Sequence, residues 1–210
     1  MILTVEVFGV IDENAYFFID DETRHGFLID PGAQADKLLK IIGERNFTVE
    51  KILLTHGHFD HIGAVNELQR ALKIPVCMSK GGNYYAKDPA INCSAFVGES
   101  IVLDDVTCLP DDTEIFLDAN KNFCVKLIPA PGHTTDGAIY YSAKNSVAFV
   151  GDTIFCGSYG RTDLPGGSYV DLMRTIREKV LTLPDETILY TGHGSQTTVA
   201  AEKQCVIFNA

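Results

Sequence analysis

The sequence has no tryptophan, only three methionines and few basic residues, with 17 lysines and arginines against 28 aspartates and glutamates. The formal net charge of -11 argues against a nucleic-acid ligand, because binding to phosphates needs a basic face. The same charge disfavours attachment to an anionic membrane surface. We therefore expect a small molecule as the partner, and neither a nucleic acid nor a membrane.

Long apolar runs and a targeting segment are also missing. No run approaches the ~18 residues that a membrane-spanning helix needs. The first basic residue is Arg24, so the N-terminus lacks the positively charged start of a signal peptide. The six cysteines are scattered and include no C-x-x-C pair, which is typical of free thiols in a reducing compartment. These absences predict a cytoplasmic protein.

What the chain does have is ample material for a core, since 46% of its 210 residues are hydrophobic. This length predicts one domain spanning residues 1–210. Apolar and turn-forming segments predict strands at 2–8, 15–20, 26–30, 51–54, 76–78, 113–117, 123–129, 137–142, 146–150 and 187–190. Helices are predicted at 35–46, at 62–73 and after Ser168, and residues 81–105 are irregular. Two β-rich stretches, each followed by helices, predict two packed sheets with helices outside.

Metal-binding residue types gather just after the predicted strands. Residues 55–61 read Thr-His-Gly-His-Phe-Asp-His, and further histidines and an aspartate lie in glycine-flanked turns downstream. Polar residues past strand ends converge at one edge of a sheet, and imidazole and carboxylate groups suit zinc, iron or manganese. A single histidine of this kind more often caps a turn, but five histidines and two aspartates together predict a metal site. The candidates are His56, His58, Asp60, His61, His133, Asp152 and His193.

The segment THGHFDH resembles the H-x-H-x-D-H signature of the metallo-β-lactamase superfamily. His133, Asp152 and His193 match the downstream ligand motifs of that superfamily in order and context. The resemblance extends from FLIDPG at 27–32 to TGHGSQT at 191–197. It implies an α/β protein with the four-layer αββα sandwich of this fold, with the metals at one edge.

The resemblance also implies two metal sites. His56, His58 and His133 would hold one ion, Asp60, His61 and His193 the other, and Asp152 would bridge them. We expect zinc. Iron and manganese are alternatives, because this donor set accepts all three metals. A metal-bridging hydroxide would then be the nucleophile.

Two aspartates have further implied roles. Asp60 would also orient the attacking water, which makes it the catalytic candidate. Asp30 would accept hydrogen bonds behind the metal loop, the alternative being a plain Asp-Pro-Gly turn.

The segment 151–168, GDTIFCGSYGRTDLPGGS, looks like the glyoxalase II-related branch, whose members act on glutathione thioesters or similar thiol adducts. Arg161 and Asp163 match its GRTD motif, and they either contact substrate or fix the loop through a mutual salt bridge. Asp152 stands where true β-lactamases typically carry cysteine, which disfavours a β-lactam substrate. The sequence runs only 17 residues past His193. We therefore expect no counterpart of the helical extension that binds glutathione in full-length members, so recognition of glutathione stays open.

Three functions follow from these residues. The leading one is a glyoxalase II-like, dinuclear-metal enzyme that hydrolyses a small thioester. The alternative is a persulfide dioxygenase with a mononuclear iron site of His56, His133 and Asp152. A metal-stabilised binding or scaffold protein is the third. The aromatic residues Tyr84, Tyr85, Phe96 and Tyr159 either line a substrate pocket or pack in the core. The oligomeric state is not predicted.

Overall fold

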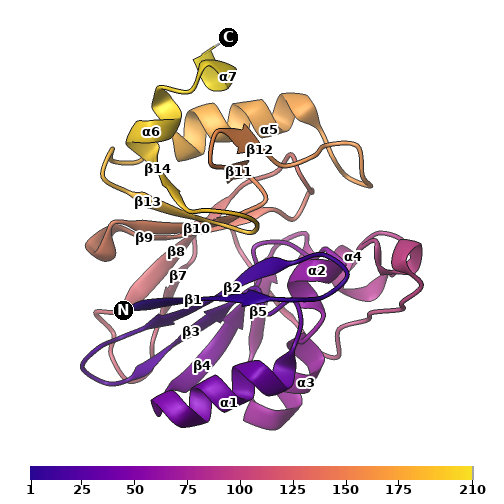
Figure 1. The fold of residues 1–210 in the computed structure, drawn as a ribbon, viewed down its shortest axis with the longest axis vertical. Coiled ribbons are helices and arrows are strands. Elements are labelled where there is room, and N and C mark those ends of the chain that lie inside the picture. The colour runs from indigo at the N-terminus through magenta and orange to yellow at the C-terminus, as the bar shows by residue number, and fades with distance from the viewer. Residues whose placement is uncertain (210) are drawn as a thin grey trace.

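The computed structural model describes residues 1–209 and places two six-stranded sheets face to face, with helices on their outer faces (Figure 1). The first sheet has the strand order β1-β2-β3-β4-β5-β6, and the second has the order β14-β13-β10-β9-β8-β7. A two-stranded hairpin of β11 and β12 completes the strands. This is the predicted αββα sandwich.

The strands of the first sheet are β1 (Ile2–Val7), β2 (Glu13–Ile19), β3 (His25–Ile29), β4 (Thr48–Leu53), β5 (Val76–Ser79) and β6 (Thr107–Leu109). The remaining strands are β7 (Glu114–Phe116), β8 (Cys124–Pro129), β9 (Ala138–Ser142), β10 (Val147–Gly151), β11 (Ile154–Phe155), β12 (Ser158–Tyr159), β13 (Ile188–Thr191) and β14 (Thr197–Thr198). The helices are α1 (Ala35–Arg45), α2 (Phe59–Ile62), α3 (Val65–Leu72), α4 (Gly82–Lys87), α5 (Tyr169–Thr175), α6 (Val199–Lys203) and α7 (Val206–Asn209). Two short 3-10 turns, η1 (Ser94–Val97) and η2 (Ala143–Asn145), and a π-helical turn, η3 (Ile176–Val180), complete the elements.

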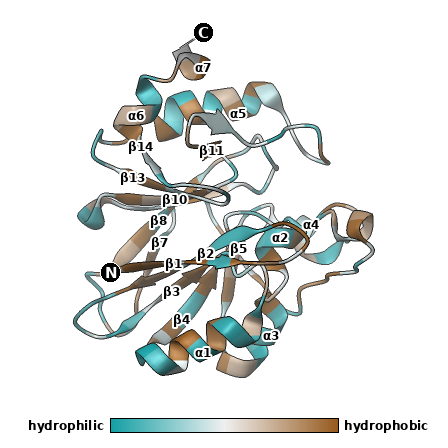
Figure 2. Cartoon of the chain, viewed as in Figure 1, coloured by the Kyte–Doolittle hydropathy of each residue, from teal (hydrophilic) through white to brown (hydrophobic). Residues whose placement is uncertain are grey.

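The first sheet is covered on both faces, because successive side chains of a strand point to opposite faces and all of those in β2 are buried. Phe17 packs with the helices α1 and α3, whereas its neighbours Tyr16 and Phe18 face the second sheet. Figure 2 shows the matching pattern on α1, where hydrophobic and hydrophilic residues alternate around the helix. Each fully buried side chain of this size stabilises the fold by roughly 1.5–3 kcal/mol.

The second sheet follows the same rule. In β10, Val147 and Phe149 face the first sheet, while Ala148 and Val150 pack against α5 on the outside. The ring of Phe149 meets the ring of Phe18 across the interface, with centroids 5.4 Å apart. Because the strands of both sheets are apolar on both faces, each sheet packs against the other sheet on one face and against helices on the other, which gives four layers.

Most predicted elements are present, with differences at short or interrupted segments. The predicted helix 62–73 corresponds to α3, which begins at Val65, and the separate short helix α2 ends at Ile62. Between them the N–H of Ala64 donates to the carbonyl of Pro31. Residues 81–105 contain only α4 and η1, in agreement with an irregular segment. The short strands β6, β11, β12 and β14 and the helices α6 and α7 were not predicted.

The strand directions bring several loops to one edge of the sandwich. In the first sheet β3 runs parallel to β4, so both end on the same side. In the second sheet β8 and β10 are both antiparallel to β9, and β13 is parallel to β10. The loops after β3, β4, β8, β10 and β13 therefore meet at one edge. Among the described residues, no helix is both long and apolar enough to cross a membrane.

Candidate metal centre

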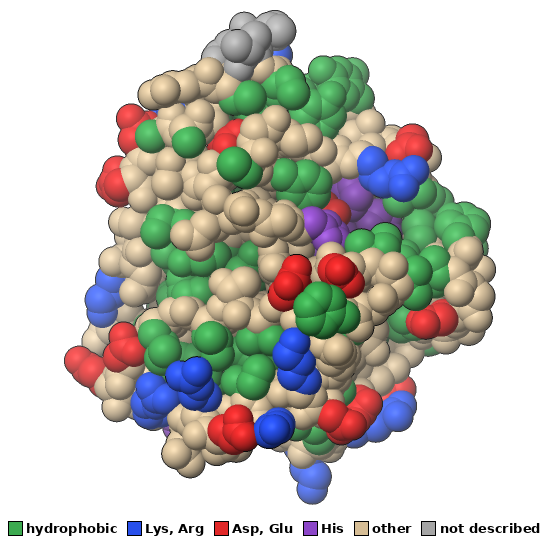
Figure 3. All heavy atoms as spheres, viewed as in Figure 1, with side chains coloured by type: hydrophobic (Ala, Val, Ile, Leu, Met, Phe, Trp, Pro, Cys, Tyr) green, Lys and Arg blue, Asp and Glu red, His purple; other side chains and the backbone are tan. Residues whose placement is uncertain are grey.

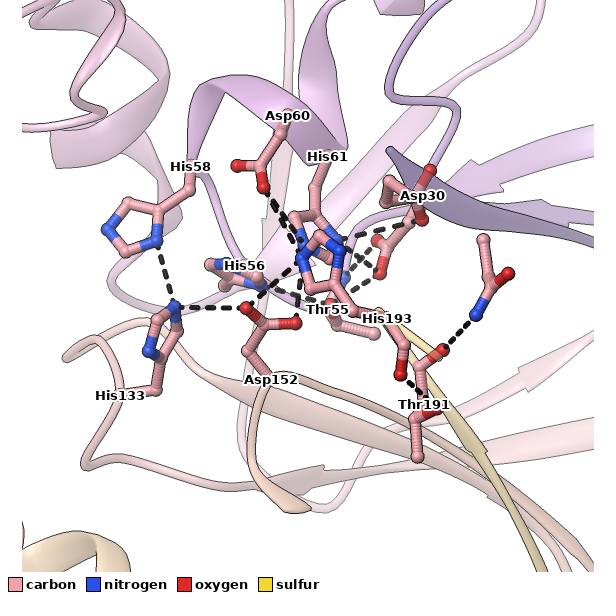
Figure 4. A network of polar contacts seen from close by, with 12 residues as sticks. Asp30, Thr55, His56, His58, Asp60, His61, His133, Asp152, Thr191 and His193 are labelled. Carbon is pink, nitrogen blue, oxygen red and sulfur yellow. Dashed lines mark hydrogen bonds and ion pairs between the residues drawn. The ribbon is translucent and has the colours of Figure 1, made fainter. Parts of the chain in front are cut away.

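The side chains predicted to bind metal converge at this edge from both sheets (Figure 4). The first sheet contributes the loop after β4 and the short helix α2, which together carry the H-x-H-x-D-H segment. The second sheet contributes the turns after β8, β10 and β13. These elements bring together all seven candidates: His56, His58, Asp60, His61, His133, Asp152 and His193.

Close contact between the two sheets at this edge depends on a glycine. Gly151 ends β10 with a φ of 50°, in the left-handed region, and a side chain there would overlap the side chain of Thr55. Thr55 directly precedes His56, and Gly151 directly precedes Asp152. The contact therefore aligns the ligand-bearing loops of the two sheets.

The first group of side chains consists of His56, His58 and His133, whose ligand atoms all lie within 4.8 Å of one another. The Nδ1 atom of His58 is 2.9 Å from Nε2 of His133. On its other side, His133 donates its Nδ1–H to the backbone carbonyl of Arg161 at 2.7 Å. Because a carbonyl can only accept, the proton of a neutral His133 is on Nδ1 and the lone pair of Nε2 faces the centre.

The second group consists of Asp60, His61 and His193, again with ligand atoms within 4.8 Å of one another. Asp60 Oδ2 is 3.4 Å from His193 Nε2. The ring of His193 is oriented from behind by its Nδ1–H, which donates to the carbonyl of Asp12 at 2.6 Å. Both groups therefore contain histidines whose Nε2 atoms are directed inward by backbone carbonyls.

Asp152 lies between the two groups and contacts both. Its Oδ1 is 3.4 Å from Nε2 of His61, and its Oδ2 is 3.6 Å from Nε2 of His133 and 3.4 Å from Nε2 of His193. A carboxylate placed in this way can share its oxygens between two cations. Asp152 therefore lies between the two groups, and its bridging role stays a prediction.

Asp30 supports the centre from behind, on the side of the first sheet. Its buried carboxylate accepts hydrogen bonds from the backbone N–H of Thr55 at 2.7 Å and from the Thr55 hydroxyl at 2.5 Å. Its Oδ2 also lies 3.1 Å from Nδ1 of His61. Asp30 therefore orients His61 and the start of the H-x-H segment together, which is more than a plain Asp-Pro-Gly turn would do.

Unpaired buried atoms show that these residues fit metal ions. Among the described residues, the buried polar atoms without a hydrogen-bond partner include Nε2 of His56 and of His61 and Oδ1 of Asp152. Leaving such atoms unpaired costs roughly 1–3 kcal/mol each. Divalent cations would satisfy them, and histidine with carboxylate is a donor set that zinc, iron and manganese all accept.

The electrostatics of the two groups differ. Burial and the neighbouring His133 lower the pKa of His58 to about 3, so this ring is neutral, as a metal ligand must be. Burial also acts to lower the pKa of His193, but its contacts with Asp152 and Asp60 raise it to about 10. The carboxylates of the second group thus attract positive charge, which a bound cation would provide.

A cavity of about 460 Å³ opens onto both groups. Its walls include His58, Asp60, His133, Asp152 and His193, so a molecule in the cavity reaches the centre directly. Apolar side chains form most of the remaining wall: Ile11, Phe59, Phe96, Val97, Phe155 and Leu164. Cys93 and Arg161 complete the lining.

The GRTD motif forms the mutual salt bridge considered above. Nε and a terminal nitrogen of Arg161 lie 2.7 and 2.8 Å from the two carboxylate oxygens of Asp163. Arg161 also lines the cavity, and its carbonyl orients His133. The loop therefore has a structural role, and direct contact with substrate stays a prediction.

Of the four aromatic residues considered for a pocket, only Phe96 is in the lining of this cavity. Tyr84 is exposed, Tyr85 is buried and hydrogen-bonded to the backbone of Pro165 and Thr135, and Tyr159 packs against the outer core of the second sheet. The six cysteines are free, as expected.

Several residues at the centre were not predicted from the sequence. Thr55 links Asp30 to the H-x-H segment, and its place directly before His56 was the available signal. Glu13 is a buried carboxyl near His61 whose two oxygens have no hydrogen-bond partner, and burial raises its pKa well above the ordinary range. Nothing in the local sequence distinguishes Glu13, or the cavity wall residue Ile11, from ordinary loop and strand positions.

The chain is similar to known proteins along most of its length. The model of the metallo-beta-lactamase superfamily matches residues 9–193. The probable metallo-hydrolase YqgX of Bacillus subtilis (strain 168) is 37% identical over 198 residues, which cover 93% of this chain and 91% of that protein. Hydroxyacylglutathione hydrolase GloC of Haemophilus influenzae is 33% identical over 210 residues, which cover 96% of each protein.

Two solved structures are similar to this chain in both sequence and fold. The crystal structure of the BLEG-1 B3 metallo-beta-lactamase is 33% identical and superposes with a TM-score of 0.93 over 100% of both chains. The di-iron-bound form of TTHA1623 is 32% identical, with a TM-score of 0.85 over 97% of this chain and 98% of that chain.

Proposed function

The chain belongs to the metallo-beta-lactamase superfamily and is one of its metallohydrolases, and on that basis we propose that it hydrolyses a small thioester. The observation that carries the proposal is the pair of complete ligand groups, joined by Asp152, at the base of the cavity. The similarity to a hydroxyacylglutathione hydrolase at 33% identity supports a thioester as the substrate class. Zinc as the metal and a cytoplasmic location stay predictions.

In this proposal the two ligand groups hold one divalent cation each. Bound there, the cations would supply a water whose pKa is lowered toward ~7 and a Lewis acid for the carbonyl oxygen. Asp60 Oδ2 lies beside His193 and lines the cavity, so it can accept a hydrogen bond from the attacking water and orient it. The carbonyls of Arg161 and Asp12 keep His133 and His193 in the tautomer that leaves Nε2 free.

The test is release of free thiol from S-lactoylglutathione by the purified, metal-loaded protein. His58→Ala should lose at least ~100-fold in kcat/KM, because a ligand of the first group is gone. His25→Ala is the matched control, since His25 pairs with Glu50 outside the centre. Absence of turnover across a panel of thioesters would refute the proposal.

A persulfide dioxygenase is the second candidate, supported by the similarity to ETHE1 from Myxococcus xanthus, which is 26% identical with a TM-score of 0.75 over 97% of this chain and 82% of that chain. His56, His133 and Asp152 would then hold a single iron with open positions for oxygen. Oxygen uptake by the iron-loaded protein with glutathione persulfide, without thiol release from thioesters, would favour this function. A zinc-loaded protein that hydrolyses thioesters and consumes no oxygen would exclude it.

A β-lactam substrate is tested in the same series, because the BLEG-1 structure is so similar. The Asp152 argument against β-lactams predicts that hydrolysis of a chromogenic cephalosporin is far slower than hydrolysis of the thioester. Faster cleavage of the β-lactam would overturn that argument.

A further inference from the structure

The wall of the cavity above the metal centre is largely apolar. Phe59 lies in α2, Phe96 in η1, Phe155 in β11 and Leu164 in the loop after β12, so the apolar wall is assembled from four separate segments. Figure 3 shows histidine side chains in a hollow that is bordered by hydrophobic side chains, with charged side chains on one side of it. Such a wall favours a substrate that buries apolar surface beside the reacting bond.

The rim of the cavity also exposes large apolar side chains to solvent. Ile11 is 46% exposed and Phe96 is 68% exposed, although both line the cavity. Ile11 belongs to the loop before β2 and Phe96 to η1, so they approach the opening from different parts of the chain. Exposed apolar side chains gathered at a cavity are typical of a surface that a ligand covers.

Free positive charge is scarce in the same cavity. Among the described residues that line it, Arg161 is the only lysine or arginine. Its guanidinium is already engaged by both carboxylate oxygens of Asp163. The acidic side chains and the histidines of the lining all belong to the metal centre: Asp60, Asp152, His58, His133 and His193. Away from the metal ions proposed at its base, a substrate carboxylate beside this apolar wall would therefore lose water without gaining an unengaged cation, which is unfavourable.

From the apolar wall and the scarcity of free cations, we propose that this site selects thioesters whose flanking groups are uncharged and apolar, in preference to conjugates of glutathione, a peptide that carries two carboxylates and one ammonium group. This inference rests on the proposed thioester hydrolysis and names its substrate class. Each methylene that the substrate buries against the wall should raise kcat/KM about fourfold until the cavity is filled. A glutathione group should lower kcat/KM relative to a neutral thiol that carries the same acyl group.

The experiment measures kcat/KM for butanoyl, hexanoyl and octanoyl thioesters of N-acetylcysteamine, and for hexanoyl and lactoyl thioesters of glutathione. The expected result is a rise along the neutral series and at least tenfold lower kcat/KM for hexanoylglutathione than for its neutral counterpart. Phe96→Ala should flatten the dependence on chain length. Tyr84→Ala is the control, since Tyr84 is 62% exposed and lies outside the cavity lining.

A binding measurement separates the inference from the proposed function. Calorimetry with S-butyl, S-hexyl and S-octyl thioethers of N-acetylcysteamine reports recognition without turnover. Affinity that rises with chain length, and falls in Phe96→Ala, supports apolar selection. If thioesters are cleaved but glutathione conjugates are preferred, or chain length has no effect, the inference is wrong and the hydrolase proposal remains. If no thioester is cleaved, the proposed function and the substrate class built on it are both overturned, even if the thioethers bind.

Discussion

Asp30→Asn should weaken metal binding while leaving the fold intact. Oδ1 of Asp30 accepts from the backbone N–H of Thr55, and Oδ2 accepts from the Thr55 hydroxyl and faces Nδ1 of His61. Asparagine can keep an oxygen on only one of these two sides, because its amide nitrogen donates and does not accept. The variant therefore leaves either the backbone of the metal loop or the ring of His61 without its partner.

The size of the effect follows from these contacts. A hydrogen bond to a charged group contributes about 1.5–3 kcal/mol, and loss of a carboxylate that orients a metal-binding histidine lowers metal affinity about 10- to 100-fold. That range corresponds to about 1.4–2.7 kcal/mol. We expect the weaker binding at the ion that His61 would hold, with a parallel loss in kcat/KM.

The assay is competition for zinc between the protein and a chromogenic chelator, which resolves two binding events. Asp171→Asn is the matched control, since Asp171 is an exposed carboxylate paired with Arg174 on α5. Circular dichroism establishes that both variants are folded. Unchanged affinity for both ions in a folded Asp30→Asn protein would refute the supporting role of Asp30.

Three further predictions concern the centre, the fold and the metals. Gly192→Ala should abolish activity, because the new methyl group would overlap the carboxylate of Asp152. Its control is Gly43→Ala in α1, where the new methyl group meets nothing within 4 Å. This control should be stabilised by about 0.5–1 kcal/mol. Glu50→Gln should destabilise the protein at pH 7 by about 1–3 kcal/mol in denaturant titrations. Burial acts to raise the pKa of Glu50, but hydrogen bonds from two backbone N–H groups and a histidine ring lower it below 4.5. The stabilisation is therefore complete above about that pH and is lost as the pH falls through the folded-state pKa. Removal of metals by a chelator should lower the melting temperature by roughly 8–16 °C for each site, if the free metal concentration before chelation was about 1,000 times the Kd of that site.

Each of these predictions has an outcome that contradicts it. Full activity of Gly192→Ala would mean that the turn at Gly192 can move away from Asp152. A stability difference between Glu50→Gln and the parent that stays constant down to pH 3 would exclude an effect of the Glu50 charge. A melting temperature that does not respond to chelation and to restored zinc would mean that the ions bind weakly or not at all.

Several features of the fold were predictable because they depend on neighbours in sequence. Tyr16, Phe17 and Phe18 are consecutive apolar residues whose side chains point to alternate faces, so their strand is covered on both faces. Ser168, followed by Asp171, marks the start of α5, where the serine hydroxyl accepts from the Asp171 N–H. The helix predicted for 62–73 is present as α3 but begins only at Val65. Just before it, the N–H of Ala64 donates to the carbonyl of Pro31, a contact that no helical periodicity reports.

The sequence by itself determined the two apolar faces of each sheet and the identity of the candidate ligands. Four of the seven lie within residues 56–61, and the other three follow strands, so local spacing was enough to expect them at one edge. Only the tertiary structure decided how they are oriented and what surrounds them. The carbonyl of Asp12 fixes the tautomer of His193, and Ile11 and Phe155 share one cavity wall, through contacts between segments far apart in the chain. Sequence periodicity reports neighbours within about one helical turn or along one strand, whereas the shape and polarity of the cavity depend on which distant loops the two sheets bring together.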